Sequence, residues 1–325
     1  YKEFLEFLKD ICNYENEVKT IQEYIGYILY RDYPFKKFLI LDGSGNNGKT
    51  TLIDIILKFI GQENNFAASL QSLNENEYAS SKLFGKLANI SDDLPKKAVK
   101  YTGIIKQMTG NSPMWSDIKY SPNGVSFINY AKPIYACNEL PRADDSSEAF
   151  FSRLLIITLS KKFVNKDDPR IDNETIYPAN PFLKQKLTED EQLSGIFNFA
   201  IEGLKRLLKQ GRFTIHDSME TIRKRYLEKT DPIETYIRYH VEPSEYCYIT
   251  TEELYYEIKD FCLEKQLPQP TKTAITKCIK DSQYPFYQVQ REVNGIQGVR
   301  VWMGMESKRN LRINRYSLVS QYSKD

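Results

Sequence analysis

Apolar residues recur at helical spacing at the start of the chain. They follow one another every three or four positions across residues 4–11 and again across 18–28, which predicts two helices. A continuous apolar run at residues 38–41 then predicts a strand that is buried on both faces. Further runs of this kind occupy residues 87–90, 133–136 and 154–159. Buried strands that alternate with helices predict an α/β core with a mainly parallel sheet.

Two further helices have a glycine at their predicted end. Residues 50–60 follow the first strand and have the pattern of a helix that ends at Gly61. Residues 189–210 have the pattern of a long amphipathic helix that ends at Gly211. Glycine is favoured at this position because it adopts the left-handed conformation without strain.

The pattern changes in the last third of the chain. Thr250 and Glu253 have the spacing of a capping box, which predicts the start of a helix, and residues 271–279 predict another. Two strand-like runs on either side of Asn294 and Gly295 predict a β-hairpin. Helices followed by a hairpin are typical of a winged-helix module.

These patterns divide the chain into five predicted segments. They are an N-terminal helical segment (1–34), an α/β core (35–165), a helical lid or connector (166–228), a winged-helix-like domain (229–306) and a basic tail (307–325).

Composition narrows the function only a little. The 325 residues are 41% hydrophobic and 27% charged, which is enough to bury a sizeable core. The 45 Lys and Arg residues against 43 Asp and Glu residues give a net charge of +2, so a site for a polyanion must be a local patch. No apolar run approaches the length of a membrane span, and we expect no membrane association.

The five cysteines are scattered, with no CxxC pair, and only two histidines accompany them. This favours reduced thiols and a cytoplasmic location, and it argues against a structural zinc site. The first ten residues are too charged for a signal peptide. Because the first residue is Tyr1 and not Met, we expect the chain to be part of a longer polypeptide.

Residues 43–50, GSGNNGKT, match the phosphate-loop pattern and lie between an apolar strand and a helix. Glycines let backbone N–H groups turn toward phosphate oxygens, and the start of the helix adds positive potential. Lys49 would bridge the β- and γ-phosphates of a nucleotide, and the Thr50 hydroxyl would bind Mg²⁺. The expected nucleotide-binding residues are Gly43, Ser44, Gly45, Asn46, Asn47, Gly48, Lys49, Thr50 and Thr51.

Polar residues at the ends of the later strands complete this candidate site. Asp92 and Asp93 follow the second apolar run, where one carboxylate would hold the metal and its neighbour would polarise the attacking water. Asn138 follows the third run and suits the orientation of that water. Arg153 precedes the fourth run, and if it acted on a neighbouring subunit it would stabilise charge on the transferring phosphoryl group. Taken singly, each is also an ordinary strand-end residue.

In this order the four elements resemble the superfamily 3 helicases, which are AAA+ ring motors of small DNA viruses, poxviruses, phages and plasmids. Asn89-Ile-Ser-Asp-Asp93 is similar to the acidic motif of that family, and Tyr135-Ala-Cys-Asn138 to its third motif. The segment that leads to Phe150-Phe-Ser-Arg153 resembles the one that carries the arginine finger. The resemblance implies an AAA+ P-loop core that uses ATP and Mg²⁺, with Thr50 and Asp92 at the metal and with Lys49, Asp92, Asp93, Asn138 and Arg153 as catalytic residues.

The family also has a DNA-gripping β-hairpin between the second and third motifs. In this chain Lys106 lies in the helix before the corresponding place, and Asp117-Ile-Lys-Tyr120 resembles the hairpin tip. The resemblance implies DNA contacts by Lys106, Lys119 and Tyr120, although Tyr120 stands where the papillomavirus member has His. Lys suits a phosphate and Tyr can stack on a base. The alternative is an exposed hairpin with one incidental Lys.

The residues of these motifs are more similar to those of the primase-helicase branch of phages, plasmids and poxviruses than to those of the papillomavirus branch. That resemblance implies the C-terminal part of a primase-helicase, assembled as a homo-oligomeric, hexameric ring on single-stranded and forked DNA in the host cytoplasm.

Other functions fit the phosphate loop as well. These are an AAA+ initiator or loader that remodels DNA without unwinding it, a P-loop phosphotransferase active as a monomer, and a DNA-binding scaffold that hardly turns over.

Overall fold

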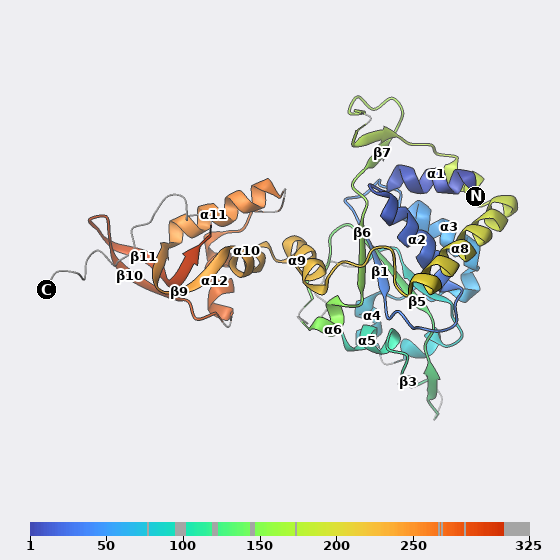
Figure 1. Ribbon diagram of the computed structural model, residues 1–325, viewed down its shortest axis with the longest axis horizontal. Coiled ribbons are helices and arrows are strands. Elements are labelled where there is room, and N and C mark those ends of the chain that lie inside the picture. The colour runs from blue at the N-terminus through green and yellow to red at the C-terminus, as the bar shows by residue number, and fades with distance from the viewer. Residues whose placement is uncertain are drawn as a thin grey trace. The chain divides into compact units, whose positions relative to one another are not determined.

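The apolar runs predicted as buried strands form one four-stranded parallel sheet in the computed structural model (Figure 1). Its order across the sheet is β2-β5-β1-β6, so β5 lies between the two strands that precede it in the chain. The prediction of an α/β fold with a mainly parallel sheet is confirmed. The strands are β1 (Phe38–Asp42), β2 (Ala88–Ser91), β5 (Lys132–Cys137) and β6 (Leu154–Thr158).

The structure describes residues 1–76, 78–94, 102–118, 123–143, 147–172, 174–265, 267, 269–282 and 284–308. The chain divides into two units, Tyr1–Arg223 and a second that begins at Lys224, within α9 (Met219–Thr230). In these ranges no helix has the length and apolar character needed to cross a membrane. No disulfide joins any two of the five cysteines, all of which lie in these ranges.

The four longest helices of the first unit share a buried cluster with one face of the parallel sheet, and Leu187 at the end of a shorter helix joins it. Successive side chains of a strand point to opposite faces, so Leu39 and Leu41 face this cluster. Phe38 faces the other side, where its ring packs against the rings of Tyr135 and Phe150. The four helices are α1 (Lys2–Ile11), α2 (Glu15–Ile28), α3 (Lys49–Ile60) and α8 (Asp190–Gln210), all predicted from the sequence pattern.

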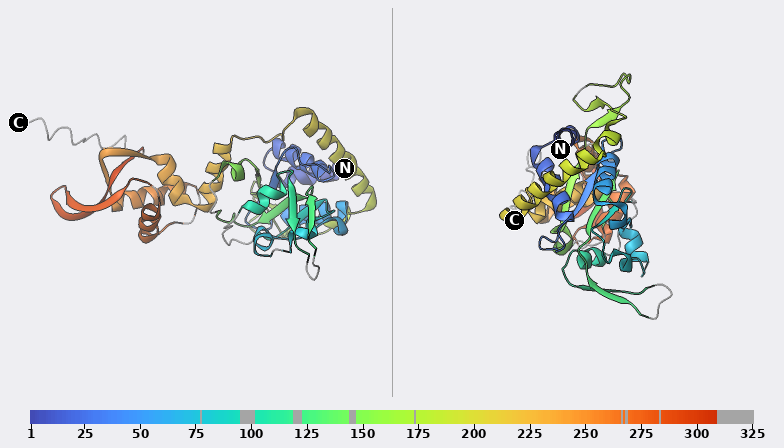
Figure 2. Two further views of the ribbon diagram at one scale, coloured as in Figure 1. Left: turned by 90° about the horizontal axis from the view of Figure 1, so that it is seen from below. Right: turned by 90° about the vertical axis from the view of Figure 1, so that its right-hand side faces the viewer.

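Shorter elements complete the first unit. The strands β3 and β4 form an antiparallel hairpin that extends away from the parallel sheet in each view (Figures 1 and 2). The elements are α4 (Leu70–Glu75), α5 (Gly103–Met108), α6 (Glu148–Phe151), α7 (Leu183–Leu187), β3 (Pro113–Ser116), β4 (Val125–Ile128), β7 (Lys162–Val164), β8 (Ile176–Pro178) and the 3-10 turns Gln62–Asn64 and Ser80–Leu83.

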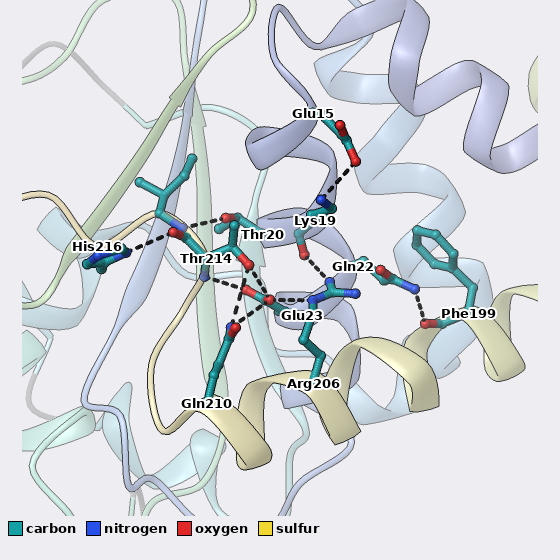
Figure 3. Close-up of polar contacts among 11 residues, drawn as sticks. Glu15, Lys19, Thr20, Gln22, Glu23, Phe199, Arg206, Gln210, Thr214 and His216 are labelled. Carbon is teal, nitrogen blue, oxygen red and sulfur yellow. Dashed lines mark hydrogen bonds and ion pairs between the residues drawn. The ribbon is translucent and has the colours of Figure 1, made fainter.

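A buried carboxylate joins α2 to α8 and to the segment after α8 (Figure 3). Glu23 has no exposed surface, and Arg206 Nε donates to its Oε1 at 2.7 Å. Gln210 Nε2 donates to the same oxygen at 2.9 Å, and the Thr214 backbone N–H donates to Oε2 at 2.8 Å. A buried carboxylate is tolerated only with such partners, so this group fixes the position of α8 on α2.

The second unit packs three helices against a three-stranded antiparallel sheet of order β10-β11-β9. The predicted capping box of Thr250 and Glu253 and the predicted turn at Asn294 and Gly295 are both present. The edge strand β9 was not predicted, because its polar sequence contains Pro243 beside a register shift. The elements are α10 (Pro232–His240), β9 (Val241–Thr250), α11 (Thr251–Glu264), α12 (Lys272–Asp281), β10 (Tyr287–Val293) and β11 (Ile296–Ser307).

Substituting Glu23→Ala should lower the free energy of unfolding of the first unit by about 3 kcal/mol or more, because Arg206 and the Thr214 N–H lose their acceptor. Urea denaturation followed by circular dichroism measures this. The matched control is Glu15→Ala, which removes an exposed ion pair to Lys19 on the same helix (Figure 3) and should leave the transition in place. Equal effects of the two substitutions would contradict the role given to Glu23.

Candidate nucleotide site

Parallel pairing brings the carboxyl ends of three strands to one edge of the sheet. Asp42, the last residue of β1, is paired with Cys137 of β5, and Ser91 at the end of β2 is paired with Tyr135. The glycine-rich loop, Asn138 and the Asp92–Asp93 pair follow these ends directly in the sequence. Three of the four predicted site elements therefore leave the sheet at the same edge.

The loop conformation explains its glycines. Gly45 and Gly48 have φ of 94° and 86°, values that side chains with a Cβ rarely adopt. Gly43 is required for a different reason, since a Cβ there would lie 2.0 Å from Asn47 Nδ2. A Cβ at Gly48 would lie 2.5 Å from Ile11 Cγ2, so the N-terminal helix α1 packs directly on the loop.

Lys49 lies at the centre of this edge and is only 6% exposed. Its ammonium donates to Gly43 O at 2.5 Å, to Asn47 Oδ1 at 2.9 Å and to Asn138 Oδ1 at 3.4 Å. All three acceptors are neutral, and burial lowers the pKa of Lys49 while nearby Cys137 and Asp42 oppose that change. The Coulomb attraction of an anion bound here would offset the solvation free energy that the ammonium loses on burial.

Asn47 has a role that the sequence pattern did not reveal. Its side chain is 2% exposed, and its Nδ2 donates to Leu159 O, just after β6, at 3.0 Å. Its Oδ1 accepts from Lys49, so the amide links the lysine to the end of β6, the strand beside β1. The neighbouring Asn46 has φ of 52°, and its carbonyl accepts from Phe163 N–H at 2.7 Å. Asparagine is among the few residues that adopt this conformation readily.

The start of α3 fits a phosphate. Helix N-termini leave their first N–H groups without partners inside the helix, and Gly48 at the cap has no side chain to satisfy them. Thr50 is exposed and Thr51 half-buried in that first turn, while Ser44 is exposed in the loop. Backbone donors, one ammonium and a hydroxyl together suit a phosphate group and its metal ion.

Asp92 and Asp93 are exposed at the end of β2. The next residue, Leu94, donates its N–H to Ala136 O at 2.8 Å, so the chain stays beside β5 as it leaves the sheet. Among the described residues no three Asp, Glu, His or Cys side chains form a metal-binding group. A cation at Thr50 and Asp92 would therefore take its other ligands from phosphate oxygens and water.

Arg153 lies at the opposite edge of the sheet. Leu154 is paired with Phe38 at the start of β1, and Phe38 N–H donates to Arg153 O at 2.9 Å. The five residues of β1 separate this edge from the loop by about 16 Å. The Arg153 Nε donates to Thr109 Oγ1 at 3.0 Å and its Nη1 donates to Ala149 O, and burial lowers its pKa. Arg153 thus lies away from the phosphate loop of its own chain.

The residues predicted to contact DNA belong to the hairpin region. Lys106 is half-buried on α5, which packs against β3. Lys119 and Tyr120 lie outside the described residues, so their contacts stay predictions.

A model of DUF5906, a family of unknown function, matches residues 41–153. This span contains the loop, Asp92, Asp93, Asn138 and Arg153.

Two viral proteins named as helicases are distant relatives. L207/L206 of Acanthamoeba polyphaga mimivirus is 26% identical over 217 residues, which are 62% of this chain and 22% of that protein. Protein 022R of Frog virus 3 (isolate Goorha) is 25% identical over 169 residues, 47% of this chain and 17% of that protein.

The chain thus spans about a fifth of the length of the curated relatives it matches. Among solved structures, the apo NrS-1 C-terminal region is similar with a TM-score of 0.52 and 14% sequence identity. The alignment covers 94% of this chain and 76% of that one, and at this identity it supports a similar fold.

Substituting Asn47→Ala should weaken binding of Mg-ATP about tenfold, because Lys49 and the loop lose a buried hydrogen-bonding link on each side. Titration with a fluorescent ATP analogue measures this. Lys58→Ala removes an exposed lysine from the last turn of the same helix and should bind as the wild type does. Unchanged affinity in Asn47→Ala would show that the link does not support a nucleotide.

Proposed function

We propose that the chain is an ATP-dependent helicase motor of the superfamily 3 type, with an AAA+ P-loop core. The observation that carries the proposal is the arrangement of Lys49, which lies between the glycine-rich loop and Asn138 while the two aspartates leave the sheet at the same edge. This edge combines groups for phosphate, metal and water in one place. The strand order supports the proposal, because β5 separates the loop strand from the strand that precedes the aspartates.

ATP would bind along residues 43–51. Lys49 would exchange neutral oxygens for phosphate oxygens, and the N–H groups at the start of α3 would donate to the same phosphates. Thr50 and Asp92 would hold Mg²⁺, which supplies positive charge to the phosphates when bound. Asp93 would accept a proton from the attacking water, and the Asn138 amide would orient that water.

The position of Arg153 supports action on a neighbouring subunit. With the loop about 16 Å away at the other edge, the guanidinium would need another chain to reach a γ-phosphate. To do so it would have to break its hydrogen bond to Thr109. A charge-assisted hydrogen bond to a phosphate oxygen would replace that bond and is stronger. Such sharing implies head-to-tail contacts between identical chains, which in the proposed family close into a hexameric ring.

Nucleic acid is the proposed substrate of the motor. The viral relatives carry helicase names, and the hairpin with Lys119 and Tyr120 would follow one strand of DNA. We further propose that the chain is the C-terminal part of a primase-helicase. In the second unit, three helices and an antiparallel sheet fit a winged-helix module that would contact either duplex DNA or another protein.

The shared site makes a prediction for mixed proteins. Lys49→Ala should abolish ATP hydrolysis, and Arg153→Ala should lower its rate about a thousandfold or more. Mixing the two inactive proteins in equal amounts should restore activity, since about a quarter of the contacts in a random ring pair an intact loop with an intact arginine. A steady-state phosphate-release assay measures this. Lack of recovery at every ratio would contradict action between subunits.

Unwinding separates the helicase from its alternatives. The wild-type chain should displace the strand of a tailed DNA fork in the presence of ATP and Mg²⁺, and Lys49→Ala should not. Gel analysis of a labelled fork measures the displacement. ATP hydrolysis without displacement would favour an initiator or loader, while a monomer that phosphorylates a small molecule would favour a phosphotransferase.

A further inference from the structure

Trp115 on strand β3 exposes 66% of its surface. The chain has two tryptophans, and the other, Trp302 in the second unit, is fully buried. Exposure of a large aromatic ring in water forgoes the free energy that burial would provide. The position on a hairpin that extends from the sheet (Figures 1 and 2) makes this ring accessible.

The orientation of the ring is fixed by two contacts within the hairpin. The indole Nε1 donates to Asp117 Oδ1 at 3.3 Å. The ring also lies against the backbone of Gly124, where a Cβ would come within 2.3 Å of its Cζ2 atom. Gly124 therefore leaves room for the ring, and little rotamer freedom remains to be lost when a ligand binds.

The face of the hairpin opposite Trp115 packs against the rest of the first unit. Side chains alternate along β3 and β4, and Met114 and Phe127 on the opposite face are buried. The Phe127 ring packs edge-on against Phe84 at 5.5 Å, and Asn129 Nδ2 donates to Met108 O at the end of α5. The strand that carries Trp115 is thus anchored to the body of the first unit.

The surroundings of Trp115 favour a flat ligand over a protein. On the exposed face of the hairpin Ser126 is directly opposite, and Ile128 is the exposed apolar neighbour. This apolar surface is far smaller than the roughly 800 Å² that each partner buries in a stable protein interface. Lys106 on α5, which packs against β3, adds positive charge for a backbone phosphate.

We propose that Trp115 is a stacking platform for a base of single-stranded nucleic acid. The exposed ring face receives one base, Asp117 accepts a hydrogen bond from the indole N–H, and Lys106 supplies positive charge for a phosphate. Stacking on an aromatic ring tolerates any base, as a moving motor requires. The inference rests on the proposed function for its ligand class and adds a residue and a contact to it.

The test uses the two unequal tryptophans. In the full chain carrying Trp302→Phe, excitation at a wavelength that tyrosine does not absorb gives emission from Trp115 alone, and titration with an oligodeoxythymidylate of about 20 nucleotides should quench it. Trp302 has a buried indole N–H without a hydrogen-bond partner, so phenylalanine removes no such bond. The same titration of the unmodified chain, in which the buried Trp302 stays constant, serves if the substitution unfolds the second unit.

Affinity supplies the second measurement. By fluorescence anisotropy of a labelled oligodeoxythymidylate, Trp115→Ala should bind about tenfold more weakly, whereas Trp115→Phe should stay within about threefold of the wild type. Tyr14→Ala removes a 73% exposed aromatic ring from the turn between α1 and α2, and it should bind normally. Circular dichroism checks that each variant is folded.

Two outcomes would overturn the inference. If the oligonucleotide binds without quenching and Trp115→Ala binds equally well, the base does not stack here, while the proposed function stands. If no chain binds the oligonucleotide with or without a non-hydrolysable ATP analogue, the platform is refuted, and recovery of ATP hydrolysis in the Lys49→Ala and Arg153→Ala mixture decides separately on the motor.

Discussion

The parallel register of β5 between β2 and β1 is the constraint on which the candidate site depends. It brings Lys49 Nζ to within 3.4 Å of an amide oxygen on Asn138, 89 residues away in the sequence. A slip of one residue would move Ile134 and Ala136 to the other face of the sheet, away from the cluster that they share with the helices. Burial of ordinary apolar side chains therefore sets the positions of the polar groups at the edge.

Lys49 shows how the loop is prepared for an anion. An ammonium that is removed from water loses solvation, and three neutral oxygens restore only part of it. Asn47 prevents the lysine from turning away, since its amide is itself tied to Leu159 O. The arrangement is built before any ligand arrives, and less ordering is left to occur during binding.

Sequence patterns predicted the parts of the fold whose signals are local. Continuous apolar runs gave the four parallel strands, and Gly61, Gly211, Thr250 and Asn294 marked helix and turn ends through their own backbone preferences. The strand β9 was not predicted, because an edge strand needs little apolar character and can contain a proline such as Pro243.

The candidate site was predictable in the same uneven way. The residues of the loop follow a local pattern, and the sheet edge that collects Asn138 follows from strand polarity. The link from Asn47 to Leu159 spans 112 residues and has no local signature. Exposure of Trp115 depends on which face of a hairpin packs inward, which alternation alone does not determine.

The placement of Arg153 has a geometric consequence under the proposed function. A chain that presents its loop at one edge of the sheet and its arginine at the other makes two unlike contact surfaces, so neighbours must join head to tail. Head-to-tail contacts either close into a ring, when a whole number of subunits completes one turn, or continue as a helical filament. The angle between successive subunits, rather than any residue of the site, would then decide how many nucleotides are hydrolysed around one strand.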